Sequence, residues 1–355
     1  MFYSGIDLHK NMSFITTLNE KGIVIKQDKL PNDEHTILNY FYSIGKHHKA
    51  VVECIANWYW LSDLLNDHGI ELILAHAKYL KAISYAKVKT DKVDSATLAR
   101  LLRINMIPVA HQISPTHRGL RDLMRARLKL VRKNTSCQNS IHRLLEKLNI
   151  SIPDNRKLHD LSTFDLLVNL PLSSDTQFQM DLLKQQIVLL HKQIKDLEQS
   201  LHPRLLPNED IQRLLWIPGI GKILAFTIYL EIDGINRFPD VKNFYSYCRL
   251  VPGSNNSNKK VKHKSGNKDG NKYLKMAFTE ASVRSVQYFK EIKQYYQSKA
   301  RRKHKCIARN IVAGEIAKIC YYVLKTKTDF NNTFKGKTLS KRKTMQWPRL
   351  TSPDV

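Results

Sequence analysis

The chain contains 355 residues, which is enough for two or three domains that each bury a core of their own. Lysine and arginine number 58 against 31 aspartate and glutamate residues, and the formal charge of +27 favours nucleic acid as the partner. The five cysteines are scattered and odd in number, which argues against a disulfide framework. The sequence shows no charged apolar leader and no apolar run of about 18 residues, which argues against export and membrane insertion. We therefore predict a cytoplasmic protein with no membrane partner.

Short apolar strands and helices alternate along the first part of the chain. Residues 2–8, 13–18 and 22–27 are β-type runs separated by polar turns, which predicts a three-stranded meander. An amphipathic helix over 33–45 and a buried strand over 50–54 follow. This part therefore begins as an α/β domain.

A further strand and a long helix continue the alternation. Residues 71–75 are a short apolar run, and the segment from Asp91 to Arg103 carries apolar residues at helical spacing. The resulting order of elements is that of an RNase H or RuvC-like α/β domain. In that topology, acids at the ends of the first and fourth strands and on a late helix converge.

Four acids occupy those positions: Asp7, Glu53, Asp91 and Asp94. Asp91 and Asp94 are three residues apart, so they share one face of their helix. Carboxylates gathered in this way hold hard divalent ions against phosphate, and two such ions stabilise both oxygens of a phosphoryl transfer. We predict a Mg²⁺ site, with Mn²⁺ as the alternative ion. Each acid could instead be an isolated strand-end or helix-end charge.

Residues 116–205 read as basic helices followed by a coiled coil. Between 118 and 147, nine lysines and arginines interleave with leucines, a pattern that buries one stripe and lays the other along phosphates. From this segment we assign nucleic-acid binding to Arg118, Arg121, Arg125, Arg132 and Lys133.

A heptad seam follows in the same region, at alternating steps of three and four residues. Its members are Met180, Leu183, Ile187, Leu190, Ile194, Leu197 and Leu201. The pattern favours a coiled-coil dimer or a helical hairpin. A core helix packed inside one subunit is the alternative.

Residues 206–327 form a third, mainly helical region. The sequence Pro218-Gly219-Ile220-Gly221-Lys222 before an apolar run resembles a helix-hairpin-helix, whose turn and helix N-terminus bind phosphate. We therefore add Gly219, Gly221 and Lys222 to the nucleic-acid-binding set. A plain glycine-containing turn is the alternative, and the spacing of a Walker A loop is missing, so ATP use is not supported.

A lysine-rich polar stretch lies further along this region. Seven lysines and one acid fall between residues 259 and 275, and a segment this polar wraps a phosphodiester more readily than it packs. The lysines assigned to nucleic acid are Lys259, Lys260, Lys262, Lys264 and Lys272. The local sequence alone favours a solvated loop serine, rather than a nucleophile, at the nearby Ser257. The tail, 328–355, is basic and lacks periodicity, so we predict disorder or bound RNA there.

Several segments together resemble one family. GIDLHKN, VVECIANWYWLSDLL, KTDKVDSATLARLLR, LLWIPGIGKILA and GNKYLKMAFTEA are similar to segments of the insertion-sequence transposases of the IS110 (IS-one-ten) family, related to the Piv and MooV DNA invertases. The resemblance covers about residues 1–325. It implies a RuvC-like domain over 1–115 with Asp7, Glu53, Asp91 and Asp94 as its acidic tetrad, a coiled-coil linker, and a transposase domain.

The resemblance also implies a catalytic serine. Counting back from GNKYL places it at Ser257, with Ser254 and Ser265 as alternatives; Asn258 follows where the family often has glycine. In this family the serine attacks a DNA phosphate, and a structured bridge RNA from the element pairs with donor and target DNA, so base pairing selects the sequence. Members form dimers that pair into a tetramer and act in the bacterial cytoplasm, at the nucleoid.

Two other functions compete with DNA recombination. A RuvC-like nuclease of the junction-resolvase type would use water as the nucleophile and form no covalent intermediate. A non-catalytic RNA-binding or regulatory protein could keep the fold, but the presence of all four acids argues against it.

Overall fold

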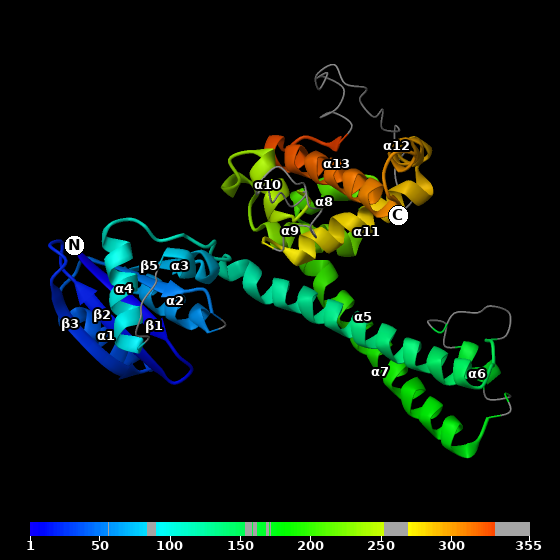
Figure 1. Cartoon of the computed structure of the whole chain (residues 1–355), viewed down its shortest axis with the longest axis horizontal. Helices are drawn as coiled ribbons and strands as arrows, with labels where there is room; N and C mark the ends of the chain where they lie inside the picture. The colour runs from blue at the N-terminus through cyan, green and yellow to red at the C-terminus, as the bar shows by residue number, and fades with distance from the viewer. Residues whose placement is uncertain are drawn as a thin grey trace, which may run out of the picture. The chain divides into compact units, whose positions relative to one another are not determined.

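The computed structural model describes residues 1–55, 57–83, 90–152, 158, 162–167, 170, 172–251 and 269–330. The chain forms two compact units, Met1–Ile113 and Ser114–Val355 (Figure 1). Ser254, Ser257, Ser265, Lys259, Lys260, Lys262, Lys264 and the tail beyond 330 lie outside the described residues.

The first unit contains a mixed five-stranded sheet. Its strands are β1 (Phe2–Leu8), β2 (Met12–Leu18), β3 (Val24–Pro31), β4 (His48–Glu53) and β5 (Glu71–Ala75). Their order is β3-β2-β1-β4-β5. β1 pairs antiparallel with β2 and parallel with β4, and β4 pairs parallel with β5. The α/β class predicted for this part of the chain is confirmed, and β1 and β4 are neighbours.

Helices cover both faces of the sheet. The helices α1 (Glu34–Tyr42) and α2 (Trp58–Asp67) pack on one face, where Ile6, Phe41 and Leu61 are fully buried. On the other face, α3 (Ala77–Ile83) and α4 (Asp91–Arg103) place Leu80 and Leu98 against Val51. Alternating side chains of one strand point to opposite faces, so β4 contributes to both cores.

The second unit begins with a long helical hairpin. Its arms are α5 (Pro115–Lys147) and α7 (Ser174–Leu205), and the short α6 (Thr163–Leu167) packs near the tip (Figure 1). Polar contacts that join the described parts of the two arms include Arg127 to Glu198, Asn134 to His191, and Cys137 to Gln186. Residue numbers rise on one arm as they fall on the other, so the helices are antiparallel.

The heptad seam of α7 packs within the chain. Met180, Ile187 and Leu190 are buried in one cluster with Ile141 and Leu145 of α5. The seam therefore forms a helical hairpin, one of the two arrangements that its spacing favoured. A second face of α7 stays exposed and carries large apolar side chains: Phe178, Leu182, Val188 and Leu189.

The remaining described parts of the second unit, over residues 206–251 and 269–330, are mainly helical. They contain α8 (Glu209–Leu215), α9 (Lys222–Ile232), the 3-10 turn η2 (Ile235–Arg237), α10 (Val241–Tyr247), α11 (Lys272–Tyr288), α12 (Lys290–Ala300) and α13 (Lys305–Thr326). The fully buried Phe226, Phe244 and Phe278 lie at the centre of their core, which confirms the α class predicted for this part of the chain. Among the described residues, no helix is long and apolar enough to cross a membrane.

Candidate functional site

The first candidate site lies where β1 and β4 end. Ile6 pairs with Val52 in the parallel register, so the next residues, Asp7 and Glu53, occupy equivalent positions on neighbouring strands. Residues in register on adjacent strands point to the same face. Asp7 and Glu53 therefore point away from buried Ile6, toward the face that α4 covers.

A glycine lets α4 approach this face closely. A Cβ on Gly5 would stand 2.0 Å from the Ser95 carbonyl oxygen and 2.5 Å from the Ala99 nitrogen, so any side chain there would push the helix away. Ser95 Oγ also lies 2.7 Å from Thr16 Oγ1 of β2. The first half of α4 is thus held against β1 and β2. Its contact with β1 is at Gly5, two residues before Asp7.

The N-terminus of α4 carries the other two predicted acids. Thr90 caps the helix by accepting a hydrogen bond from the Val93 N–H, and Asp91 and Asp94 occupy the first turn. The positive end of the helix dipole favours carboxylates in this turn. That effect offsets part of the repulsion between acids gathered at one place.

A histidine that the sequence analysis missed joins this cluster. His9 Nε2 lies 3.3 Å from Asp7 Oδ2 and 3.4 Å from Asp91 Oδ1. One ligand atom each from Asp7, His9 and Asp91 lies within 4.8 Å of the others. The sequence signal was a histidine two residues after the acid at the end of the strand, in the run GIDLHK.

The electrostatics of Asp7 reflect the crowding. Burial raises the pKa of Asp7, and the negative charges of Asp91 and Asp94 raise it further, while the neighbouring His9 lowers it. A cation placed among these groups would relieve the repulsion. Carboxylate oxygens suit Mg²⁺ and Mn²⁺, and imidazole also suits transition metals, so the donor set fits a divalent ion.

The four predicted acids are not equally close. Asp7 and Asp91 share the three-ligand group, and Asp94 acts on Asp7 through its charge. Glu53 lies beside Asp7 by strand register but outside that group. Glu53 and Asp94 both make further interactions in this structure.

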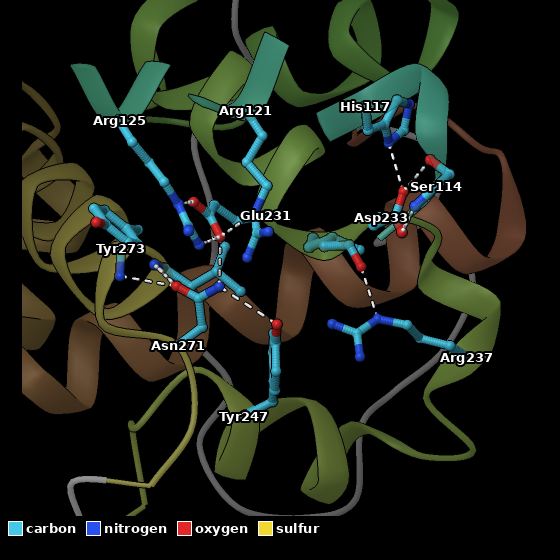
Figure 2. Close-up of polar contacts among 12 residues, drawn as sticks. Ser114, His117, Arg121, Arg125, Glu231, Asp233, Arg237, Tyr247, Asn271 and Tyr273 are labelled. Atoms are coloured by element: carbon cyan, nitrogen blue, oxygen red, sulfur yellow. Dashed lines mark hydrogen bonds and ion pairs between the residues drawn. The ribbon is translucent and has the colours of Figure 1, made fainter. Parts of the chain in front are cut away.

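A buried ion-pair network occupies the second unit (Figure 2). Glu231 of α9, with 3% of its side chain exposed, accepts hydrogen bonds from Arg121 Nε at 3.0 Å and from Arg125 Nε at 2.6 Å. Asn271 Nδ2 donates to the same carboxylate at 2.7 Å. Burial alone would raise the pKa of Glu231, but the hydrogen bond from Arg125 and the charges of both arginines outweigh burial and lower it.

This network bears on the predicted phosphate-binding arginines. Arg118 and Arg121 are buried, and the guanidinium groups of Arg121 and Arg125 are bonded to Glu231 within the chain. Phosphate binding by these three residues stays a prediction. Arg132 and Lys133, further along α5, are exposed and make no ion pair with another described residue.

Asn271 also joins the two ends of the segment 252–268. Its backbone N–H donates to the Tyr247 carbonyl at 2.6 Å, and Arg249 Nε donates to the Gly270 carbonyl at 2.8 Å. Gly270 has a φ of +100°, and a Cβ there would meet the Tyr247 carbonyl oxygen at 2.5 Å. Tyr247 and Arg249, which precede residues 252–268 in the chain, therefore contact Gly270 and Asn271, which follow them, beside the Glu231 network.

The glycine-rich turn between α8 and α9 has two different sides. Gly219, with a φ of +83°, packs against α11, where a Cβ would stand 2.2 Å from Ser285 Oγ. Gly221 faces open space and Lys222 is exposed at the start of α9. Lys272, at the start of α11, is exposed beside the ring of Tyr273.

Comparison with known proteins places both halves of the chain in one group. Residues 4–150 match a family model for the DEDD transposase of IS110, described as a transposase. Residues 211–297 match the model of the transposase IS116/IS110/IS902 family. The two matches include β1 to α5 and α8 to α11.

Curated relatives agree with these models. The chain is 22% identical to the transposase for insertion sequence element IS1328 of Yersinia enterocolitica, over 92% of this chain and 98% of the relative. It is also 22% identical to the transposase for IS1111A of Coxiella burnetii, over 75% of this chain and 70% of the relative, and to a probable family 20 transposase of Pseudomonas aeruginosa, over 76% and 80%. The models that match residues 4–150 and 211–297, together with these relatives, identify the chain as an insertion-sequence transposase of the IS110 family.

Proposed function

We propose that this transposase cuts and rejoins the DNA of its insertion sequence with an acidic metal site and a serine nucleophile. The observation that carries the proposal is the meeting of Asp7 and Asp91 at the end of the central strand, in a chain of a DEDD transposase family. Asp94 and Glu53 would complete the tetrad. Donor and target DNA are the substrates that membership of the family implies.

The acidic cluster would hold Mg²⁺, or Mn²⁺ in its place. When bound, such ions supply positive charge to the attacking and leaving oxygens of a phosphoryl transfer. Asp7 and Asp91 offer one oxygen each, and His9 lies between them as a third donor. The packing of Gly5 against α4 keeps the two carboxylates at a fixed separation, because both lie on rigid elements.

Ser257 is the proposed nucleophile. Its Oγ would attack a DNA phosphate, so that an Oγ–P bond forms as one strand P–O bond breaks and the strand end leaves as a hydroxyl group. The meeting of Tyr247 and Asn271 supports this assignment, because it ties both ends of the serine segment to a rigid, buried network. Ser254 and Ser265 are the alternative positions.

A serine nucleophile forms a covalent intermediate with DNA, whereas water-driven cleavage of the junction-resolvase type does not, so a test of Ser257 distinguishes the two functions. We expect Ser257→Ala to lose both recombination and the covalent DNA adduct, with little change in stability, because one hydroxyl is removed from a polar segment. Labelled DNA trapped on the denatured protein measures the adduct. If Ser257→Ala forms the adduct but Ser254→Ala or Ser265→Ala does not, the nucleophile is the serine whose loss removes the adduct. If all three variants recombine DNA at the full rate, the water-driven nuclease is the better assignment.

We further propose that a structured guide RNA of the element selects the DNA sequences, in which case the protein reads RNA backbone and shape. The exposed cations of α5 support a polyanion-binding face. We expect Arg132→Gln with Lys133→Gln to lower the slope of log affinity against log salt by about two, roughly one for each lost phosphate contact.

Filter binding across a salt series measures this slope. Lys49→Gln is the control, because Lys49 lies in the first unit, is partly exposed and is already paired with Glu71. An unchanged slope in the double variant would assign that face of α5 to protein or solvent.

Assembly as a homodimer, and as a tetramer when two DNAs are joined, is the last part of the proposal. Because the heptad seam packs on α5, a partner helix would use the exposed Phe178, Leu182 and Leu189. We expect Leu182→Asp with Leu189→Asp to halve the mass by light scattering while helix content is kept. Ile187→Asp should instead unfold the hairpin, because it buries an unpaired charge. An unchanged mass in the double variant would remove α7 from the dimer interface.

A further inference from the structure

A hollow in the second unit opens beside the glycine-rich turn. Its volume is about 840 Å³, and it lies between the turn, the end of α7 and the end of α11. Sites for small ligands span roughly 300–1,000 Å³, so the hollow can take a nucleotide. Pro218 and Gly221 form one wall, and Trp216, Tyr288 and Phe289 contribute aromatic surface.

The charge of the hollow is positive. Lys222 and Arg284 line it, both are exposed, and neither makes a hydrogen bond or ion pair with another described residue. Glu198 is the single acid among the lining residues, and Arg127 Nη2 neutralises it at 2.6 Å. α9 begins at Lys222 without a side-chain cap, so its first-turn N–H groups add to the positive potential.

The walls of the hollow are fixed relative to one another. Ser285 Oγ donates to the carbonyl oxygen of Pro218 at 2.7 Å, and Gly219 packs directly on α11. Arg284 and Tyr288 are four residues apart on α11, so they project from the same helix face. Tyr288 is 66% exposed, so its ring is open to a base at the rim of the hollow.

We propose that this hollow binds an unpaired nucleotide of the DNA substrate. The phosphate would lie against Lys222, Arg284 and the N-terminus of α9, and the base would stack on Tyr288 at the rim. Aromatic faces beside cations are the combination that proteins use to hold single-stranded nucleic acid. A perfect duplex offers phosphates but keeps its bases stacked inside, so it would satisfy only half of the site.

The proposal rests on the DNA substrate of the transposase but not on the serine, the metal or the guide RNA. Binding can therefore be measured without catalysis, on full-length Ser257→Ala protein. The probes are a DNA duplex with one unpaired 2-aminopurine, the same duplex with an abasic site at that position, and the perfect duplex. We expect roughly tenfold tighter binding of the unpaired base than of the other two, as for one stacked base, with quenched 2-aminopurine fluorescence.

Two substitutions separate the base from the phosphate. Tyr288→Ala should abolish the preference and the quenching but keep the affinity for the perfect duplex. Arg284→Ala should weaken binding of the unpaired-base and abasic probes alike. Gln287→Ala, an exposed neighbour on α11 that does not line the hollow, is the control and should match the parent protein.

If full-length Ser257→Ala protein binds all three probes with equal affinity, the proposal is overturned and the turn is a plain contact to duplex DNA. A preference for the unpaired base that persists after Tyr288→Ala would overturn the proposal as well. Tighter binding of the same unpaired base in an RNA duplex would overturn the choice of DNA. If the enzyme that keeps Ser257 forms no covalent adduct with DNA, but the preference for the unpaired base is intact, the result would count against the serine mechanism alone.

Discussion

Asp7→Asn is expected to reduce strand exchange by at least about 100-fold, and the protein should still fold and bind nucleic acid. Loss of a residue that merely supports a metal ligand costs about 10- to 100-fold, so loss of a ligand costs no less. Folding should not suffer, because burial and the charges of Asp91 and Asp94 already raise the pKa of Asp7. The ionised carboxylate is therefore less stable in the folded chain than in the unfolded one, and a neutral amide removes that cost.

Recombination of a two-plasmid substrate in Mg²⁺ measures the first effect, and thermal unfolding measures the second. Asp28→Asn is the control, because Asp28 lies on β3 outside the cluster. Recombination by Asp7→Asn at the parental rate would refute the metal site. His9→Ala would then show whether the histidine serves the site, since it should raise the metal concentration that half-saturates activity.

Glu231→Ala is expected to lower the free energy of unfolding by about 3–5 kcal/mol. The substitution leaves Arg121 and Arg125 charged in a buried site without their partner, and an uncompensated buried charge costs that much. The effect should reach the serine segment as well, because Asn271 loses an acceptor at the point where that segment ends. Denaturant unfolding followed by circular dichroism measures the loss.

Two controls distinguish charge from packing. Glu209→Ala removes an exposed partner of Arg213 and should cost at most about 1 kcal/mol. A triple variant, Arg121→Met, Arg125→Met and Glu231→Leu, should recover most of the loss because it removes all three charges. A triple variant as unstable as Glu231→Ala would mean that shape, rather than charge, maintains this part of the core.

The same carboxylate makes stability depend on pH. Glu231 has a lowered pKa in the folded chain, so its contribution is present above the ordinary glutamate pKa of 4.5 and is lost as the pH falls through the folded value. The difference in stability between the parent protein and Glu231→Ala should therefore shrink on acidification below that range. A constant difference across the acid range would mean that Glu231 is not the titrating group.

The sequence by itself determined the elements and the kind of chemistry. Period-two runs around Asp7 and the helical stripe after Asp91 predicted strands and a helix that the structure contains, because alternation and 3.6-residue spacing follow from local backbone geometry. The acids in a strongly basic chain indicated phosphoryl transfer with a metal. The steps of three and four in α7 predicted a helix with one apolar seam.

Tertiary structure alone decided which side chains meet. His9 joins Asp7 and Asp91 because β1 ends beside the N-terminus of α4, a contact that depends on Gly5 and on residues about ninety positions away. Arg121 and Arg125 have the spacing of a phosphate-binding stripe, yet Glu231 meets them from a helix more than a hundred residues further on. Periodicity shows that a helix face is charged, but the partner of that face comes from another element. Long-range packing sets that partner, and local sequence does not encode it.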